Sequence, residues 1–444
     1  MSADPQADSQ ADSQAATHRA IEAVWRIESA KIVATVARIT RDLGQAEELA
    51  QDALVAALEH WPREGLPDNP AAWLVTTAKR RALDRLRLDK LHDAKHDELA
   101  ADLDALQAAV QPDFVDALDA ARQDDIGDDL LRLIFTACHP VLGTEARVAL
   151  TLRLLGGLST AEIARAYLVP EATIAQRIVR AKRTLAAARV PFEVPRAADR
   201  ALRLDSVLEV IYLVFNEGYS ATAGDDWMRP ALADEALRLA RTLATLMPDE
   251  AEVLGLLALL ELQASRQHAR TDAAGRAVLL MAQDRARWDR LLIRRGLAAL
   301  DRAVAIATTH DGLGPYALQA AIAASHARAA RAEDTDWATI VALYDALAQV
   351  APSPVVALNR AVAVGMAEGP AAALPLVQAL LDEGTLADYP WLHSVHGDLL
   401  DRLARGAEAR ASFERAAALT RNVRDREVLL ERVRTAGERA GPPR

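Results

Sequence analysis

The 444-residue sequence is poor in several kinds of residue, and each shortage excludes a class of protein. The chain has one cysteine, Cys138, which rules out an intramolecular disulfide and fits a reducing compartment, so we expect a cytoplasmic protein. No stretch reaches the ~18 uncharged apolar residues of a membrane span, so no membrane association is expected. The N-terminal residues also lack the apolar segment of a secretory signal peptide.

Strand-forming sequence is also scarce. Aromatic residues make up only 4% of the chain, whereas alanine, leucine and arginine, which favour helices, dominate it. We therefore predict an all-α fold, and the length allows two to four domains. Repeated Ala-Asp-Ser-Gln units predict a disordered tail at residues 1–17.

The charges are arranged in blocks. A formal net charge of -11 argues against general coating of nucleic acid. Acidic residues dominate 41–59, basic residues dominate 79–90, acidic residues return at 91–129, and basic residues return at 171–189. This alternation predicts separate surfaces with separate partners.

Apolar periodicity and capping signals place the first helices. They predict helices at 18–39, 45–61 and 70–88, with Pro62 ending the second and Asn69 capping the third. Residues 91–129 are weakly patterned and predict an acidic linker. Helices resume at about Asp129 and again at Thr144, and Gly156-Gly157 ends the latter helix.

The stretch "LSTAEIARAYLVPEATIAQRIVRAKRTL", residues 158–185, has the pattern of a helix-turn-helix. Ser159 and Glu162 predict a capping box for a helix at 160–167, Pro170 marks the turn, and a second helix follows at 171–188. The second helix has an apolar face and a polar face. The apolar face contains Ile174, Ile178, Ala181 and Leu185, and the polar face contains Thr173, Gln176, Arg177, Arg180 and Thr184. We favour a DNA-recognition helix over an ordinary hairpin with solvated arginines.

The pattern predicts a hinge at 190–195. Residues 196–444 then predict a succession of helices, with repeat character near the end. Small and large residues recur 36 residues apart, close to the ~34-residue period of tetratricopeptide repeats. One copy contains Gly397, Leu400, Ala409, Phe413 and Ala416, an earlier one contains Ala361, Val364, Ala373, Val377 and Leu380, and Tyr344, Leu347 and Pro352 end another. An irregular helical bundle is the alternative.

Catalytic patterns are weak. Cys138 and His139 lack a third orienting group and metal-ligand spacing, so we predict a buried thiol beside a loop histidine. The polar residues Asn216, Glu217, Asp284 and Arg285 are interpreted as capping or buried pairing groups. We predict no enzyme activity, no cofactor and no metal site.

Two other helices are ambiguous by themselves. The basic helix 79–90 fits either a nucleic-acid contact or a solvated face, and the acidic helix 45–61 fits either a basic protein partner or a solvated face. Their order decides between these readings. An acidic helix, a basic helix, an acidic linker and a helix-turn-helix together resemble a bacterial sigma factor of the extracytoplasmic-function group. Residues 18–90, with "DLGQAEELAQDALVAALEHW" and "NPAAWLVTTAKRRALDRLR", resemble region two, and residues 130–188 resemble region four.

The resemblance implies a role for each matching position. The polymerase-binding residues would be Asp42, Glu47, Glu48 and Asp52, facing the β′ clamp coiled coil of core RNA polymerase. The minus-ten DNA would contact Lys79, Arg80, Arg81, Arg85 and Arg87. The minus-thirty-five DNA would contact Glu171, Thr173, Gln176, Arg177, Arg180, Lys182 and Arg183, and region four would also meet the β flap. Trp73 is expected in the core of region two.

The resemblance extends to a sigma-factor subgroup with a fused helical extension. We expect residues 196–444 to regulate the sigma-factor activity. Binding of a protein partner to the repeats is one way in which they would do so. The alternative function is a stand-alone helix-turn-helix regulator whose repeats sense a ligand or a protein. Residues 41–90 favour the sigma factor, because a plain regulator needs no docking helix followed by a basic helix.

Overall fold

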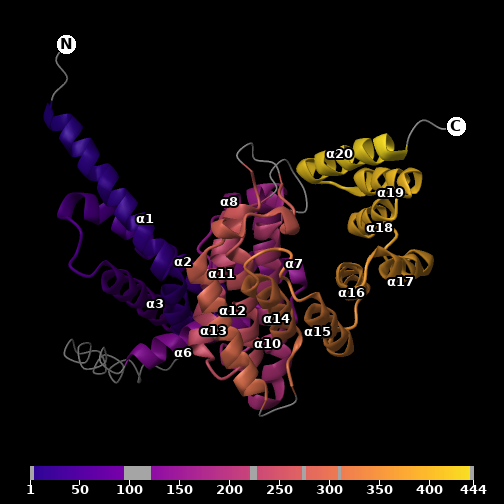
Figure 1. The fold of residues 1–444 in the computed structure, drawn as a ribbon. Coiled ribbons are helices and arrows are strands. Elements are labelled where there is room, and N and C mark those ends of the chain that lie inside the picture. The colour runs from indigo at the N-terminus through magenta and orange to yellow at the C-terminus, as the bar shows by residue number, and fades with distance from the viewer. Residues whose placement is uncertain (1–4, 95–121, 221–227, 273–276, 309–311, 441–444) are drawn as a thin grey trace. The chain divides into compact units, whose positions relative to one another are not determined.

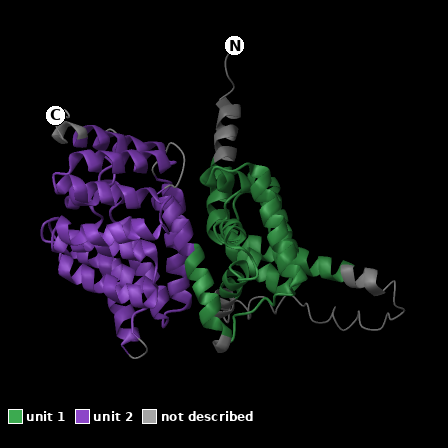
Figure 2. Cartoon of the chain, turned by 90° about the vertical axis from the view of Figure 1, so that its right-hand side faces the viewer, with its two compact units in different colours: residues 1–210 green, residues 211–444 purple. Residues whose placement is uncertain are grey.

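The computed structural model describes residues 5–94, 122–220, 228–272, 277–308 and 312–440. Within these ranges the chain forms helices and no strand, apart from an isolated bridge between Thr271 and Ala277, so the predicted all-α fold is confirmed. None of the helices in these ranges is both long enough and apolar enough to cross a membrane. The chain divides into two compact units, Met1–Val210 and Ile211–Arg444 (Figure 2).

The first unit begins with α1 (Pro5–Thr40), α2 (Leu43–Glu64) and α3 (Pro70–Ala94), which pack on one another (Figure 1). Buried Ile21, Ile32 and Leu74 lie in the core of this unit. The backbone is helical from Pro5, which differs from the disordered tail predicted at residues 1–17. Alanine and glutamine, frequent in this stretch, are good helix formers and allow α1 to extend toward the N-terminus.

The sequence predicted the start of α3 correctly but the end of α2 incorrectly. The Asn69 side chain accepts a hydrogen bond from the Ala72 amide at 3.0 Å, so the predicted cap of α3 is confirmed. The predicted end of α2 before Pro62 is wrong, because the helix continues to Glu64. A proline in the last turn removes only one hydrogen bond there, and the Gly65 amide still donates to the Trp61 carbonyl at 3.0 Å.

The first unit continues with α6 (Arg122–Ala137), α7 (Thr144–Leu154), α8 (Thr160–Tyr167) and α9 (Glu171–Ala187). Of the acidic linker predicted at 91–129, residues 95–121 lie outside the described ranges. At the two edges of the predicted linker, α3 reaches Ala94 and α6 begins at Arg122.

The helix-turn-helix forms as predicted. Ser159 and Glu162 make the capping box of α8, and Leu168 adopts a left-handed conformation with φ 52° in the turn. The apolar face of α9 is buried, and it consists of Ile174, Ile178, Ala181 and Leu185.

Helix α10 (Ala197–Tyr219) spans the boundary between the units, so the first unit extends beyond the boundary predicted at residue 196. The reason is a set of hydrogen bonds from α10 to the end of α6. The Ser206 hydroxyl donates to the Cys138 carbonyl at 2.5 Å, and the Arg203 guanidinium donates to the Phe135 carbonyl at 3.2 Å.

The second unit is built around α12 (Ala251–Ala264), which is buried along most of its length. Helices α11 (Pro230–Leu246), α13 (Arg290–Ala307) and α14 (Pro315–Arg328) pack on it. Short 3-10 turns, η1 (Gln267–Ala269), η2 (Leu280–Ala282) and η3 (Arg285–Arg287), connect α12 to α13. Helix α15 (Trp337–Val350) packs on α14.

The remaining helices pack in sequence: α16 (Pro354–Ala367), α17 (Pro370–Glu383), α18 (Pro390–Arg402), α19 (Gly406–Leu419) and α20 (Val423–Ala440). The small and large residues predicted for the two later repeats are buried. At Gly397 an added Cβ would lie 2.7 Å from the ring of Phe413, so only glycine permits this approach of α18 to α19. The predicted small-and-large packing is therefore confirmed.

Candidate nucleic-acid interface

The polar face of α9 is available for contact with DNA. Thr173, Gln176 and Arg180 are exposed there. Together with the start of α7 they border a shallow cavity of about 390 Å³. Arg177 also borders it, and its guanidinium pairs with the exposed Glu145 carboxylate at 2.5 Å. An ion pair at the surface is weak, so Arg177 can exchange this partner for another anion.

The other residues predicted for the recognition helix differ in their exposure and in their hydrogen bonds. Arg183 is exposed, in accord with a contact to DNA. Glu171 accepts a hydrogen bond from the Thr160 hydroxyl at 2.9 Å, which ties the start of α9 to α8. This bond gives Glu171 a structural role within the helix-turn-helix.

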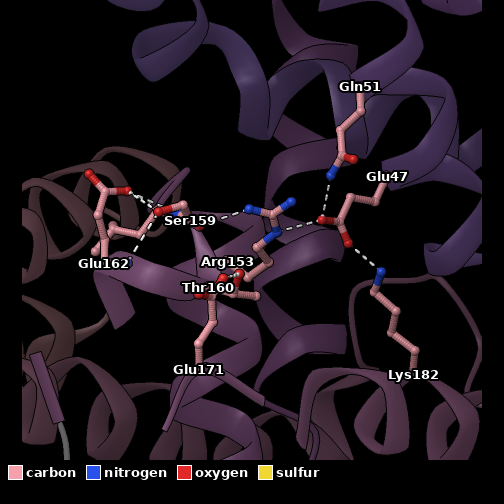
Figure 3. Close-up of polar contacts among 9 residues, drawn as sticks. Glu47, Gln51, Arg153, Ser159, Thr160, Glu162, Glu171 and Lys182 are labelled. Carbon is pink, nitrogen blue, oxygen red and sulfur yellow. Dashed lines mark hydrogen bonds and ion pairs between the residues drawn. The ribbon is translucent and has the colours of Figure 1, made fainter. Parts of the chain in front are cut away.

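Lys182 and Glu47 meet in one buried cluster (Figure 3). Glu47 of α2 is only 8% exposed, and its carboxylate pairs with Lys182 of α9 and, at 2.6 Å, with Arg153 of α7. The Gln51 side-chain amide donates to the same carboxylate at 2.8 Å. Burial raises the pKa of Glu47, but the charges and hydrogen bonds of Lys182 and Arg153 outweigh it, so the net pKa is lowered. The cluster therefore joins an ionised carboxylate to two cations.

This cluster differs from the roles that the sequence predicted. Glu47 was expected to face polymerase and Lys182 to face DNA, whereas in the structure each pairs with the other. Sequence reasoning missed Arg153 entirely, because its partner lies 106 residues away and no local pattern on α7 reveals it. The Arg153 guanidinium also donates to the Leu158 carbonyl at 3.1 Å, at the entrance to α8.

The other predicted docking residues lie along α2. Glu48 and Asp52 are exposed, whereas Asp42 caps the helix by accepting from the Gln45 amide at 2.9 Å. Asp52 pairs with Arg81 of α3 at 3.5 Å. One predicted polymerase contact is thus paired with one predicted DNA contact.

The basic helix α3 exposes much of its charge. Arg80, Arg85 and Arg87 are exposed and Lys79 is partly buried. Arg87 forms a short-range ion pair with Asp84 at 3.2 Å. On the same helix, the half-buried Trp73 packs edge to face against the buried Trp61 of α2, with ring centroids 5.3 Å apart, so it lies at the edge of the predicted core.

A second buried carboxylate connects α1 to α6. Asp129 is 2% exposed and pairs with Arg38 of α1 at 2.9 Å and with Arg132 of α6 at 2.6 Å. Because removing one partner of a buried ion pair leaves an uncompensated charge, these contacts hold α1 near α6.

The thiol of Cys138 is buried, as predicted, and contacts the Thr151 hydroxyl at 3.3 Å. Burial raises its pKa to about 11, against smaller opposing effects of Thr151 and Arg147. A thiol with this pKa is protonated at neutral pH and is a poor nucleophile. The described ranges contain no group of three or more side chains suited to hold a metal.

The first unit therefore carries both a helix-turn-helix and an exposed basic helix, an arrangement typical of DNA-binding proteins. Comparison with known families specifies the class. Residues 27–90 match Sigma-70 region 2 and residues 132–185 match Sigma-70 region 4, both inside the ranges predicted for these regions. Residues 203–304 match a family of unknown function, DUF6596.

Relatives support the same assignment. The chain is 30% identical over 159 residues to the ECF RNA polymerase sigma factor SigK of Mycobacterium ulcerans (strain Agy99), covering 35% of this chain and 78% of the relative. It is 48% identical over 386 residues to an uncharacterized protein of Rhizobium meliloti (strain 1021), covering 87% of this chain and 88% of the relative. The chain belongs to the extracytoplasmic-function group of the sigma-70 family, and it carries a long C-terminal helical extension.

Proposed function

We propose that this sigma factor binds core RNA polymerase in the cytoplasm and directs it to promoters with a minus-ten and a minus-thirty-five element. The observation that carries the proposal is the exposed polar face of α9, which belongs to a complete helix-turn-helix in region four. A second helix of this type enters the major groove, where arginine and glutamine side chains reach base edges.

Region two supplies the other two contacts of the proposal. The exposed arginines of α3, Arg80, Arg85 and Arg87, are suited to the phosphates of the minus-ten DNA. The exposed acids of α2, Glu48 and Asp52, are suited to a basic surface, which we assign to the β′ clamp coiled coil. The β flap is the proposed partner of region four.

The buried cluster adds a conformational step to the proposal. Glu47 cannot face polymerase while its carboxylate pairs with Lys182 and Arg153. Because α2 carries Glu47 whereas α7 and α9 carry the cations, we propose that regions two and four are closed on each other in the free protein. Polymerase binding would then separate α2 from α7 and α9.

Reconstitution with core polymerase tests the function. We expect the full chain to bind core enzyme and to support transcription from a set of promoters that share two elements, identified by sequencing the transcripts. Specific DNA binding without any binding to core polymerase would instead favour a stand-alone regulator.

The extension is proposed to regulate this activity, with a protein partner of the repeats as one route. A truncation tests the proposal best when it ends after Val210, because the first half of α10 contacts α6 through Arg203 and Ser206. We expect the truncated chain to differ from the full chain in polymerase affinity or promoter activity. Equal values for both would contradict the regulatory role.

A further inference from the structure

A cavity of about 300 Å³ lies within the second unit and plays no part in the proposed function. Its wall is formed by α10, α12, α14, α15 and α16, together with residues near η1 and η2. The volume is at the lower end of the range for pockets that bind small molecules. Part of the wall belongs to the segment that matches the family of unknown function.

Aromatic rings form one side of this cavity. Tyr212, Phe215 and Tyr219 line it from α10, and Tyr344 lines it from α15. The rings of Phe215 and Tyr219 stack with centroids 5.4 Å apart. Burial, together with the nearby Tyr212, raises the pKa of Tyr344 to about 12, so this hydroxyl is neutral at physiological pH. Such a wall favours a flat, apolar ligand body.

Arg266 gives the cavity its charge. Its guanidinium lies 5.9 Å from the ring centroid of Tyr219 and 5.8 Å from that of Trp288. No aspartate or glutamate occurs among the described residues that line the cavity, and Arg266 has no carboxylate partner among them. His326, on the opposite helix α14, adds no charge, because burial and the nearby Arg266 and Arg285 lower its pKa to about 4. Arg266 is therefore the charged side chain among the described residues that line the cavity, which favours an anionic ligand over a cationic one.

Two buried polar side-chain atoms in the same wall have no hydrogen-bond partner within the described ranges. They are Oε1 of Gln263 and Nδ1 of His326, and the His326 residue is only 7% exposed. The position of His326 is fixed, since Arg285 donates to its carbonyl at 2.7 Å and its ring packs edge to face on Trp337. An unsatisfied buried polar atom is costly, so a ligand with a polar hydrogen would gain from meeting these atoms.

We propose that this cavity is a binding site for a small aromatic carboxylate that also carries a hydroxyl group. The carboxylate pairs with Arg266, the ring packs among the aromatic side chains of α10, and the hydroxyl reaches Gln263 or His326. The site lies outside the DNA-binding and polymerase-binding surfaces, so this inference stands or falls independently of the sigma-factor role.

Calorimetric titration of the full chain with 4-hydroxybenzoate tests the proposal. We expect one site per chain, with weaker binding of benzoate, which lacks the hydroxyl, and no binding of the neutral 4-hydroxybenzamide. Arg266→Gln should weaken the binding of 4-hydroxybenzoate at least tenfold. Arg294→Gln, which removes an exposed arginine of α13, is the matched control and should bind like the natural protein.

A second variant keeps the test decisive if Arg266→Gln folds poorly. Gln263→Glu has nearly the same shape and places a carboxylate beside the anion, so it should also weaken binding at least tenfold. Thermal unfolding followed by circular dichroism checks that each variant is folded. The proposal is overturned if 4-hydroxybenzoate gives no binding heat at millimolar concentration. Equal binding of the neutral amide, or full binding by folded Arg266→Gln, overturns it as well.

Discussion

The replacement Arg153→Gln is expected to open the contact between regions two and four. Arg153 is chosen because it belongs to neither predicted contact surface, yet its guanidinium pairs with the buried Glu47 carboxylate at 2.6 Å. Breaking a buried ion pair costs about 3–5 kcal/mol. Lys182 remains as a second cation and the Arg153 side chain is 24% exposed, so we expect a smaller loss, of about 2 kcal/mol. This corresponds to a shift of about 30-fold toward the separated arrangement.

Distance measurement by electron spin resonance follows this opening. Spin labels attached at Glu59→Cys of α2 and Ala187→Cys of α9 report the separation of the two helices, and both positions are exposed. The native Cys138 is buried with a raised pKa, so the labels react selectively. Arg165→Gln, an exposed change on α8, is the matched control.

We expect a longer distance in Arg153→Gln and an unchanged distance in the control. Acid provides a second perturbation. The pKa of Glu47 is lowered in the closed arrangement, so its stabilisation is complete above the usual glutamate pKa and is lost as the pH falls through the lowered value. Identical distances in Arg153→Gln and the control at neutral pH would refute the idea that this cluster holds the regions together.

Three further predictions concern separate surfaces. Arg177→Ala should cost about 1–3 kcal/mol at one promoter position, measured by gel shift on promoter variants, and an equal loss on all DNA would mark Arg177 as a phosphate contact instead. Asp52→Arg should weaken binding to core polymerase in a pull-down titration and leave binding of the full chain to minus-thirty-five DNA unchanged; it also ends the pair with Arg81. Gly397→Ala should lower the stability of the second unit by about 1–3 kcal/mol in thermal unfolding, because the new methyl group would overlap the Phe413 ring, and an unchanged melting temperature would contradict the close packing.

Features fixed by local chemistry were predictable from the sequence. The capping box of Ser159 and Glu162, the bounds of α8 and the buried face of α9 depend on residues within one or two helical turns. The small residue Gly397 was predictable for another reason, because it belongs to a pattern that repeats along the chain. The start of α1 and the end of α2 were not predicted correctly. An alanine-rich segment at the start of a chain can be helical or disordered, and a proline in the last turn can either end a helix or be accommodated in it.

The pairing of charges was not predictable in this way. Periodicity placed Glu47 on an acidic stripe and Lys182 on a basic helix, and both placements are consistent with binding to outside partners. The structure brings them together because side chains of α2 reach those of α7 and α9, a tertiary arrangement that no helical pattern encodes. Arg153, the third member, carries no local signal at all.

Residues of the alternating charge blocks therefore form ion pairs with one another, in addition to the contacts that we propose with polymerase and DNA. Acidic α2 pairs with basic α3 through Asp52 and Arg81, and with α9 through Glu47 and Lys182. Under the proposed function, polymerase and promoter DNA would compete with these internal partners. The two pairs should respond differently to salt. Screening weakens the exposed Asp52 pair more than the buried Glu47 cluster, so moderate salt should free the docking surface of region two before it separates the two regions.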